Sequence, residues 1–440
     1  MTRLLSSMSA PGQRHALQAI RGRGTQLTLA DGRTVLDVGA MSANLLGHCH
    51  PEVVAAVQAA AESVNVGDMV GYPPREQAAD DILDIAYAGE DWTGSVALFV
   101  SSSEAADLGL ALAQMLTGRN PLVCRRSSYH GGVGLAREVS HHPLWNTSLA
   151  SLAGGVLDRP SLAQTREIPM PECARVFPAP GHDCAVSCLA GAPDALRDAA
   201  AVIMDYSQGG AVPSAQYQDT LAGMAKAAGA MWIADETVTG LGRMGHGFAF
   251  QRGSTRPDMV TMGKGLTGGA VPAGALILSK AVVEAIGKRR WMTSSTYRGH
   301  PLAVAAMSTV VKVIDRDGLV DRASRLGATL GPELESIAAS HPCVRGVIGE
   351  GLSWLINLAE PDRSLAEDDW SGDGQHAPMT TAVHEAILDQ GVLIPESSGD
   401  RLWIVPPLVI TEGDLATALE ALDSALVVGD RLLEAAGVAG

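Results

Sequence analysis

The sequence predicts an α/β protein in which a mostly parallel sheet lies between helices. Short apolar runs alternate with longer Ala- and Leu-rich amphipathic segments, which is the pattern of buried parallel strands connected by helices. The apolar runs predicted to be strands are residues 96–100, 122–125, 200–204, 231–234, 259–262 and 273–278. In such sheets, ligands bind beyond the carboxyl ends of the strands, so the residues there are the first candidates for a site.

Beyond residue 300 the pattern changes. Long helical segments at 301–316 and 321–338 are followed by strand-like runs within 344–358 and 402–405. This change predicts a second, smaller domain that contains the C-terminal third of the chain. The Asp-, Gly- and Ser-rich stretch 360–378 predicts a solvated excursion from it.

Composition limits the classes of partner. The net charge of −16 argues against nucleic acid and anionic membranes as partners. No run of about 18 apolar residues occurs, and the N-terminus has no sustained apolar stretch, so we expect a cytoplasmic protein. The six cysteines form no CxxC pair, and Cys184, Cys188 and His182 are only a weak metal signal. We expect reduced thiols and no metal.

Lys264 is the first candidate for chemistry. It is one of only five lysines, and it follows a predicted buried strand in the glycine-rich segment Thr-Met-Gly-Lys-Gly-Leu-Thr-Gly-Gly. Because lysine shifts its pKa readily when desolvated, a lysine here is a candidate Schiff-base nucleophile. A structural lysine at a strand terminus is the alternative, and the neighbouring motifs must decide between them.

A second strand end carries three serines. Residues 96–100 run directly into Ser101, Ser102 and Ser103, and a long amphipathic helix follows. Ser101 and Glu104 fit a capping box. The same helix N-terminus also offers backbone N–H groups and hydroxyls to a phosphate, and the two interpretations are compatible.

A third strand end carries a carboxylate pair. The apolar run 231–234 ends in Asp235 and Glu236, and a carboxylate at the end of a buried strand needs a cation or hydrogen-bond donors. One more predicted strand separates this pair from Lys264, so Asp235 and Lys264 can lie at the same edge of the sheet. A lysine, a carboxylate and an anion cradle are what pyridoxal 5'-phosphate (PLP) requires.

With these residues in place, the chain resembles the class III, or omega, aminotransferases, a family of fold-type I PLP enzymes. The resemblance covers nearly the whole chain, and its motifs occur in the family's order. They are residues 31–37 and 44–51, Ser101 to Ala105, Tyr129-His130-Gly131, 233–245, Gly263-Lys264-Gly265, Thr296-Tyr297-x-Gly299-His300-Pro301 and Pro406-Pro407-Leu408.

The resemblance implies a fold and a role for each matching residue. The fold is a large PLP-binding domain of residues 51–300 with a seven-stranded sheet, and a smaller α+β domain formed by residues 1–50 and 301–440. Lys264 would bind the cofactor and carry protons, and Asp235 would contact its pyridine nitrogen. The other implied cofactor contacts are Ser101, Ser102, Ser103, Tyr129, His130, Asp205, Gln208, Thr237, Val238 and Thr296.

The family also implies an assembly. Thr296 would reach the cofactor phosphate of a neighbouring subunit, so that the active site lies at a homodimer interface. A tetramer of two such dimers stays open.

Several residues depart from the family pattern. Serine, aspartate and threonine at 102, 205 and 237 replace the usual glycine, glutamate and valine, while Arg298 and His300 replace glycine and asparagine. Trp403 stands where many members have an arginine that binds a substrate carboxylate, and Arg401 lies two residues earlier. We take Arg298, His300, Arg401 and Trp403 as candidate substrate contacts, with a place in the small-domain core as the alternative for Trp403.

Three functions remain open at this point. Transamination of an amino acid or amine is the family's majority activity. A reaction on the same carbanion without amino transfer is the second: racemisation, decarboxylation, gamma-elimination or replacement, or carbon–carbon bond formation in specialised metabolism. S-adenosylmethionine or a nucleotide-like compound is a candidate substrate for it. An inactive binding protein is the third, and the presence of both Lys264 and Asp235 argues against it.

Overall fold

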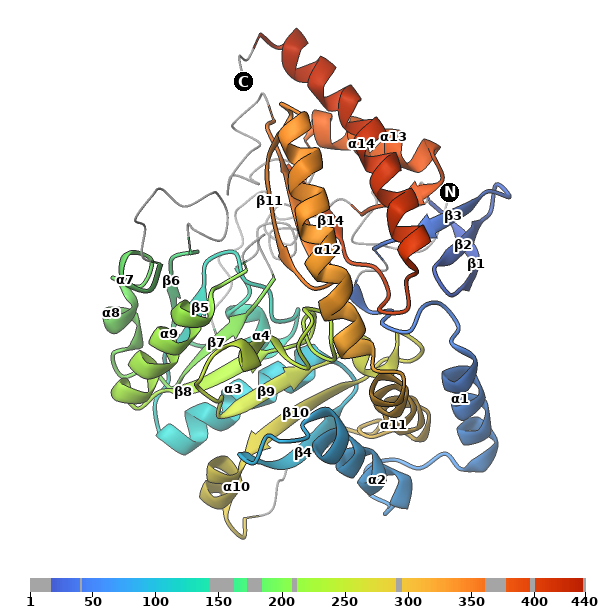
Figure 1. Cartoon of the computed structure of the whole chain (residues 1–440). Helices are drawn as coiled ribbons and strands as arrows, with labels where there is room; N and C mark the ends of the chain where they lie inside the picture. The colour runs from blue at the N-terminus through green and yellow to red at the C-terminus, as the bar shows by residue number, and fades with distance from the viewer. Residues whose placement is uncertain are drawn as a thin grey trace.

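The computed structural model describes residues 17–39, 42–141, 162–171, 184–207, 212–289, 295–360, 377–395 and 400–437. Within these ranges the strands form three sheets, of seven, four and three strands. The large sheet and its helices occupy the lower part of Figure 1, and the two small sheets lie above it with the C-terminal helices. None of the described helices is long and apolar enough to cross a bilayer.

The large sheet has the strand order β4-β10-β9-β8-β7-β5-β6. Its strands are β4 (Thr93–Phe99), β5 (Leu122–Arg125), β6 (Thr165–Ile168), β7 (Ala201–Asp205), β8 (Met231–Asp235), β9 (Met259–Met262) and β10 (Gly274–Ser279). β10 is antiparallel to both of its neighbours, whereas β9, β8, β7, β5 and β6 pair in parallel. The predicted mostly parallel, seven-stranded sheet is therefore confirmed.

Both faces of this sheet are buried, as expected for a sheet between helices. Alternate residues of β10 belong to different hydrophobic clusters: Ala275 and Ile277 to one, and Leu276 and Leu278 to the other. Burial on both faces explains why these strands could be recognised as unbroken apolar runs. β6 was missed because its sequence, Thr-Arg-Glu-Ile, has one fully buried residue and lies at the edge of the sheet.

Helices cover the two faces and surround the sheet. α3 packs against β9 and β10, and α11 packs against α1 and α2 on the right of Figure 1. The helical elements of this part are α1 (Pro51–Ser63), α2 (Pro73–Asp81), η2 (Ile82–Ala86), α3 (Ser102–Thr117), α4 (Gly134–Glu138), α7 (Cys184–Ser187), α8 (Ala192–Leu196), α9 (Ala215–Ala228), η5 (Ala249–Arg252), η6 (Lys264–Thr267), α10 (Lys280–Ile286) and α11 (Pro301–Arg316).

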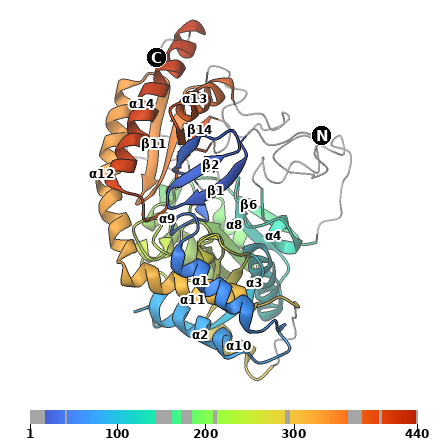
Figure 2. The ribbon, with the colours of Figure 1, turned by 90° about the vertical axis from the view of Figure 1, so that its right-hand side faces the viewer.

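The two small sheets combine segments from both ends of the chain. One has the order β1-β2-β3-β13, and β13 runs parallel to β3; the other has the antiparallel order β11-β12-β14. Figures 1 and 2 show these strands beside α12, α13 and α14. The elements are β1 (Ala19–Arg23), β2 (Gln26–Leu29), β3 (Thr34–Asp37), β11 (Val344–Glu350), β12 (Ser353–Leu358), β13 (Val392–Leu393), β14 (Arg401–Ile404), α12 (Leu319–Ser340), α13 (Pro378–Asp389) and α14 (Glu412–Ala435).

The pairing of β3 with β13 joins N- and C-terminal segments in one sheet, while the proposed domain boundaries stay a prediction. The prediction of a solvated stretch at 360–378 is wrong at Glu360 and at Ala377, which are both buried. Pro378 is exposed and begins α13. The residues between Glu360 and Ala377, 361–376, lie outside the described part of the chain.

Candidate active site

The carboxyl ends of three adjacent parallel strands bring together the central residues of the site. Asp205 of β7 pairs in register with Asp235 of β8, and Asp235 pairs with Thr261 of β9. Lys264 follows β9 directly, at the start of η6. Residues far apart in the sequence therefore meet at one edge of the sheet.

A pocket lies at this edge, beyond the strand ends, and the N-terminus of α3 forms part of its wall. Its lining comes from the ends of β4, β5, β7, β8 and β9. The lining residues are Ser102, Ser103, Tyr129, His130, Gly131, Asp205, Ser207, Asp235, Thr237, Val238 and Lys264.

Most of the residues predicted to contact the cofactor line this pocket, and among the described ones two, Ser101 and Thr296, do not. Ser101 lies behind the lining, and its Oγ accepts the backbone N–H of Glu104 at 3.2 Å as the N-cap of α3. Thr296 is exposed, outside the lining, and Gln208 lies outside the described residues. Glu104 completes the cap by accepting the N–H of Val100 at 3.0 Å, one residue earlier than in a standard capping box.

Asp235 is buried and surrounded by hydrogen-bond donors. Its Oδ2 lies 2.7 Å from Nδ1 of His130, and its Oδ1 accepts the N–H of Thr237 at 3.0 Å and the hydroxyl of Thr261 at 2.9 Å. These donors offset the cost of burying the carboxylate and fix its orientation. Thr261 was missed by sequence reasoning, although it is the one polar residue in the buried strand β9.

Lys264 has an unusual backbone and a perturbed amine. Its φ is 42°, a left-handed conformation that non-glycine residues adopt at a cost and that is often found at functional sites. Burial lowers the pKa of its amine, and the negative charges of Asp235 and Asp205 oppose that shift in part. A lower pKa leaves more of the amine neutral, which is the nucleophilic form.

The α3 end of the pocket suits an anion. α3 begins at Ser102, and the first N–H groups of a helix have no acceptor within it, so they attract negative charge. Two glycines, Gly131 and Gly263, let their backbones pack closely against residues 101–103, the serine loop. A Cβ at Gly131 would lie 2.4 Å from Ser103 Oγ, and one at Gly263 would lie 2.7 Å from Ser102 Cβ.

Two further polar atoms of the pocket could bind a ligand. Ser207 Oγ and His130 Nε2 are buried and have no hydrogen-bond partner among the described residues. Burial and the charge of Asp235 raise the pKa of Tyr129, so its phenol is neutral. An amine, a carboxylate, an anion cradle and an aromatic ring in one pocket fit PLP. Ser207 was not predicted, although it lies just beyond a buried strand end.

Asp205 forms a buried ion pair. Arg125, at the end of β5, has a fully buried side chain, and its Nη2 lies 2.6 Å from Asp205 Oδ1. The backbone N–H of Ser207 contacts the same oxygen at 3.2 Å. Sequence reasoning placed Arg125 at a strand end but could not identify its partner, because the two residues are 80 positions apart.

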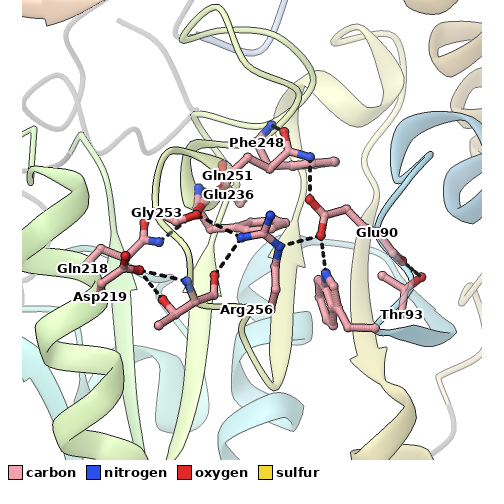
Figure 3. Close-up of polar contacts among 12 residues, drawn as sticks. Glu90, Thr93, Gln218, Asp219, Glu236, Phe248, Gln251, Gly253 and Arg256 are labelled. Atoms are coloured by element: carbon pink, nitrogen blue, oxygen red, sulfur yellow. Dashed lines mark hydrogen bonds and ion pairs between the residues drawn. The ribbon is translucent and has the colours of Figure 1, made fainter.

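The connection between β8 and β9 is fixed from two sides (Figure 3). On one side, the carboxylate of Asp219 accepts hydrogen bonds from the backbone N–H and hydroxyl groups of both Ser254 and Thr255. On the other, Glu90 forms an ion pair with Arg256 at 2.6 Å. These contacts fix the path of the chain between Asp235 and Lys264.

The candidate substrate residues lie outside the pocket lining. Arg298 is buried, with Cζ 4.5 Å from the centre of the Phe99 ring and Nη2 3.9 Å from Oε1 of Glu104. His300 accepts the N–H of Leu302 through Nδ1 at 3.3 Å and so caps α11. Their predicted contact with substrate therefore stays a prediction.

Arg401 and Trp403 also contact protein groups. Arg401 Nε donates to Asn357 Oδ1 at 3.0 Å and lies 3.7 Å from Asp400 Oδ1. Trp403 is half-buried, and its Nε1 donates to Ser353 Oγ at 3.2 Å. Among the described residues, no group of three or more His, Cys, Asp or Glu side chains could hold a metal ion.

Known proteins share this fold and sequence pattern. The family model for class-III aminotransferases matches residues 8–426. The chain is 31% identical over 417 residues to the acetylornithine aminotransferase of Mycolicibacterium smegmatis, a match that covers 93% of both chains. The structure superposes with a TM-score of 0.88 on an S-selective transaminase from Arthrobacter sp., at 27% identity and with 97% and 96% of the two chains covered.

A further solved structure with the same fold is named as a lyase and not as an aminotransferase. A phospholyase from Arthrobacter, solved with phosphoethanolamine, has a TM-score of 0.80, 26% identity and coverage of 94% of this chain and 95% of its own. The family match spans nearly the whole sequence and agrees with the pocket's amine, carboxylate and anion cradle. The chain therefore belongs to the class-III aminotransferases and is a PLP-dependent transferase.

Proposed function

We propose that this enzyme transfers the amino group of a small amino acid or amine to an oxo acid, with PLP held in the pocket at the carboxyl ends of β7, β8 and β9. The observation that carries the proposal is the meeting of Lys264, Asp235 and the N-terminus of α3 in one pocket. When bound, PLP supplies an aldehyde for amines and an electron-withdrawing ring that stabilises a carbanion.

The residues of the pocket divide this task. Lys264 would hold the cofactor through its amine, whose pKa burial lowers. The same amine would accept the proton from the substrate carbon and deliver it to the cofactor, so that the amino group stays with the cofactor. Asp235 would hold a proton on the ring nitrogen, and His130 and Thr261 fix its carboxylate. The first turn of α3, with the hydroxyls of Ser102 and Ser103, would bind the phosphate.

The faces and the remaining edge of the ring would meet other residues of the lining. Tyr129 and Val238 would lie against the two faces of the ring. Asp205, fixed by Arg125, and Ser207 offer polar groups to the remaining edge. In these positions they would keep the reacting carbon next to Lys264 and limit access of water.

We further propose a homodimer in which Thr296 of one subunit reaches the cofactor phosphate bound by the other. Thr296 is exposed, and Tyr297 beside it is 64% exposed. Met69 and Val70 are exposed at 89% and 53% on a neighbouring loop. An exposed apolar surface of this kind is typical of a protein–protein interface.

For the amino donor, we propose an amine or an omega-amino acid that does not need an arginine beside its reacting carbon. The pocket lining, as described, contains no arginine, and Arg298 and Arg401 contact Glu104 and Asn357 instead. Acetylornithine aminotransferases and an S-selective transaminase are among the proteins to which the chain is similar. The first of these names contains an amino acid derivative, acetylornithine, which agrees with an omega-amino donor.

A second candidate is a reaction without amino transfer, such as an elimination. The match to a phospholyase favours it, because that enzyme shares the fold over nearly its whole length. The departures from the family at Arg298 and Trp403 are compatible with such a change of substrate.

The two candidates differ in what an amine does to the bound cofactor. Under the proposal, mixing the PLP-loaded enzyme with a suitable amine and no oxo acid converts the cofactor to its pyridoxamine form, and the visible absorbance band disappears. A panel of amines and omega-amino acids, including phosphoethanolamine, would be tested in this way. Catalytic product formation from a panel member without that conversion would contradict transamination and support elimination.

A further inference from the structure

The turn at residues 295–300 carries two of the exposed residues of the proposed interface, Thr296 and Tyr297. It is folded tightly by two backbone hydrogen bonds, from Arg298 N–H to Ser295 O at 3.0 Å and from His300 N–H to Tyr297 O at 3.2 Å. Thr296 and Tyr297 are the central residues of the first turn, and both are exposed. The side chain of Arg298 is buried instead.

Arg298 contacts both sides of the serine loop. Its guanidinium lies over the ring of Phe99, the last residue of β4, and within 3.9 Å of Glu104 in the first turn of α3. Phe99 and Glu104 flank Ser102 and Ser103, and Glu104 also takes part in the cap of α3. The arginine thus joins the interface turn to the anion-binding end of its own pocket.

A second arginine contacts the turn on its other side. Arg75 Nε donates to the carbonyl of Gly299 at 2.9 Å, and its Nη1 and Nη2 donate to the carbonyls of Val70 at 3.0 Å and Gly67 at 3.3 Å. A Cβ at Gly299 would lie 2.6 Å from Arg75 Nε. Arg75 therefore fixes the turn against the loop that carries the exposed Met69.

We infer that Arg298 is a positioning residue: it aligns Thr296 for the neighbouring subunit's cofactor phosphate by fixing the turn to the serine loop of its own subunit. The inference rests on the proposed homodimer site. It assigns Arg298 a role through Thr296, in place of direct contact with substrate. Because the guanidinium is planar and stacks on Phe99, lysine should replace it only in part.

Titration of the apoenzyme with PLP, followed by absorbance, tests the inference through a double-mutant cycle of Arg298→Met and Thr296→Val. We expect each single variant to weaken PLP binding about tenfold, the order of a lost hydrogen bond to a charged group. The double variant should bind about as weakly as Thr296→Val alone, because Arg298 acts through Thr296. Arg316→Met, which removes an exposed arginine that contacts Glu52 and Asp317, is the control and should bind PLP normally.

Thermal unfolding of each apo variant and the KM for the amine are measured alongside. Arg298→Lys is the second variant if Arg298→Met does not fold, and it should show a smaller loss of PLP affinity. Three results would overturn the inference: a lower Tm with normal PLP affinity, effects that simply add in the double variant, or a raised amine KM as the sole change. Normal PLP affinity in Thr296→Val would overturn the inference too, because it would show that Thr296 does not contact the neighbouring subunit's cofactor. That result would not contradict the proposed role of Lys264.

Discussion

Nδ1 of His130 lies 2.7 Å from Oδ2 of Asp235, and its other ring nitrogen is buried without a partner among the residues that the structure describes. The imidazole and the hydroxyl of Thr261 contact different oxygens of the carboxylate. Asp235 is therefore fixed from two sides by protein groups. In the proposed mechanism, this arrangement determines how well Asp235 holds the proton on the pyridine nitrogen.

Replacing His130 with phenylalanine removes that hydrogen bond but keeps a planar ring. We expect kcat to fall about 10- to 100-fold, because hydrogen bonds to charged groups contribute roughly 1.5–3 kcal/mol. Steady-state kinetics would measure the change, with His246→Phe as the control, since His246 contacts Glu350 away from the pocket lining. An unchanged kcat in His130→Phe would show that the Asp235 carboxylate needs no support from His130.

The Arg125–Asp205 ion pair predicts a marked loss of stability when one partner is removed. Arg125→Met leaves the carboxylate of Asp205 buried without its cation, which costs about 3–5 kcal/mol in similar cases. Adding Asp205→Asn should recover much of that loss. Urea unfolding of the apoenzyme would measure both, and equal stability of the single and double variants would argue against the ion pair.

Glu236 predicts a pH dependence of stability near neutrality. Burial raises the pKa of this carboxyl from its ordinary value of 4.5 to about 7, although Thr239 and the N–H groups of Phe250 and Ala249 oppose the shift. A group with a raised pKa in the folded state stabilises most below its unfolded pKa. That contribution is lost as the pH rises from about 4.5 through about 7.

The variant Glu236→Gln should therefore flatten the dependence of the unfolding free energy on pH across this window. Urea unfolding at several pH values between about 4.5 and 8 would show the difference. Parallel curves for the wild type and the variant would mean that another group titrates there.

The hydrogen bonds of Asp219 predict a loss of folding stability at acidic pH. Burial opposes ionisation of its carboxyl, but hydrogen bonds from Thr255 and Ser254 outweigh that effect and lower its pKa from 3.8 to about 2. Its contribution is present above the unfolded pKa and is lost as the pH falls through about 2. Asp219→Asn should lower stability at pH 7 by about 1–2 kcal/mol and reduce the loss on acidification. The same loss between pH 4 and 2 in both proteins would exclude this role.

How much could be predicted from the sequence depended on burial. Strands β5 and β9 have the bounds that their apolar runs predicted, and α11 coincides with the predicted helix 301–316. The number of strands in the large sheet followed from the resemblance to a known family, whereas their order came from the structure. β6 was missed because an edge strand needs few apolar residues.

The site residues likewise divide into those that could be predicted from the sequence and those that could not. Lys264 and Asp235 could be recognised because a charged residue at the end of a buried strand is rare and needs a chemical reason. Arg125 and Thr261 were missed, because each acts through a neighbour that only the strand order brings close. The placement of Arg298 against Phe99 could not be predicted either, since it depends on how the turn before α11 packs against the end of β4.

The proposed function depends most directly on covalent attachment of the cofactor to Lys264. Purified with PLP, the wild-type protein should show a visible absorbance band that borohydride abolishes, and peptide mapping should then find the cofactor attached at Lys264. Lys264→Ala should lack the band, whereas Lys226→Ala, which removes an exposed lysine of α9, should keep it. A band that persists in Lys264→Ala, or a label on another residue, would contradict the assignment.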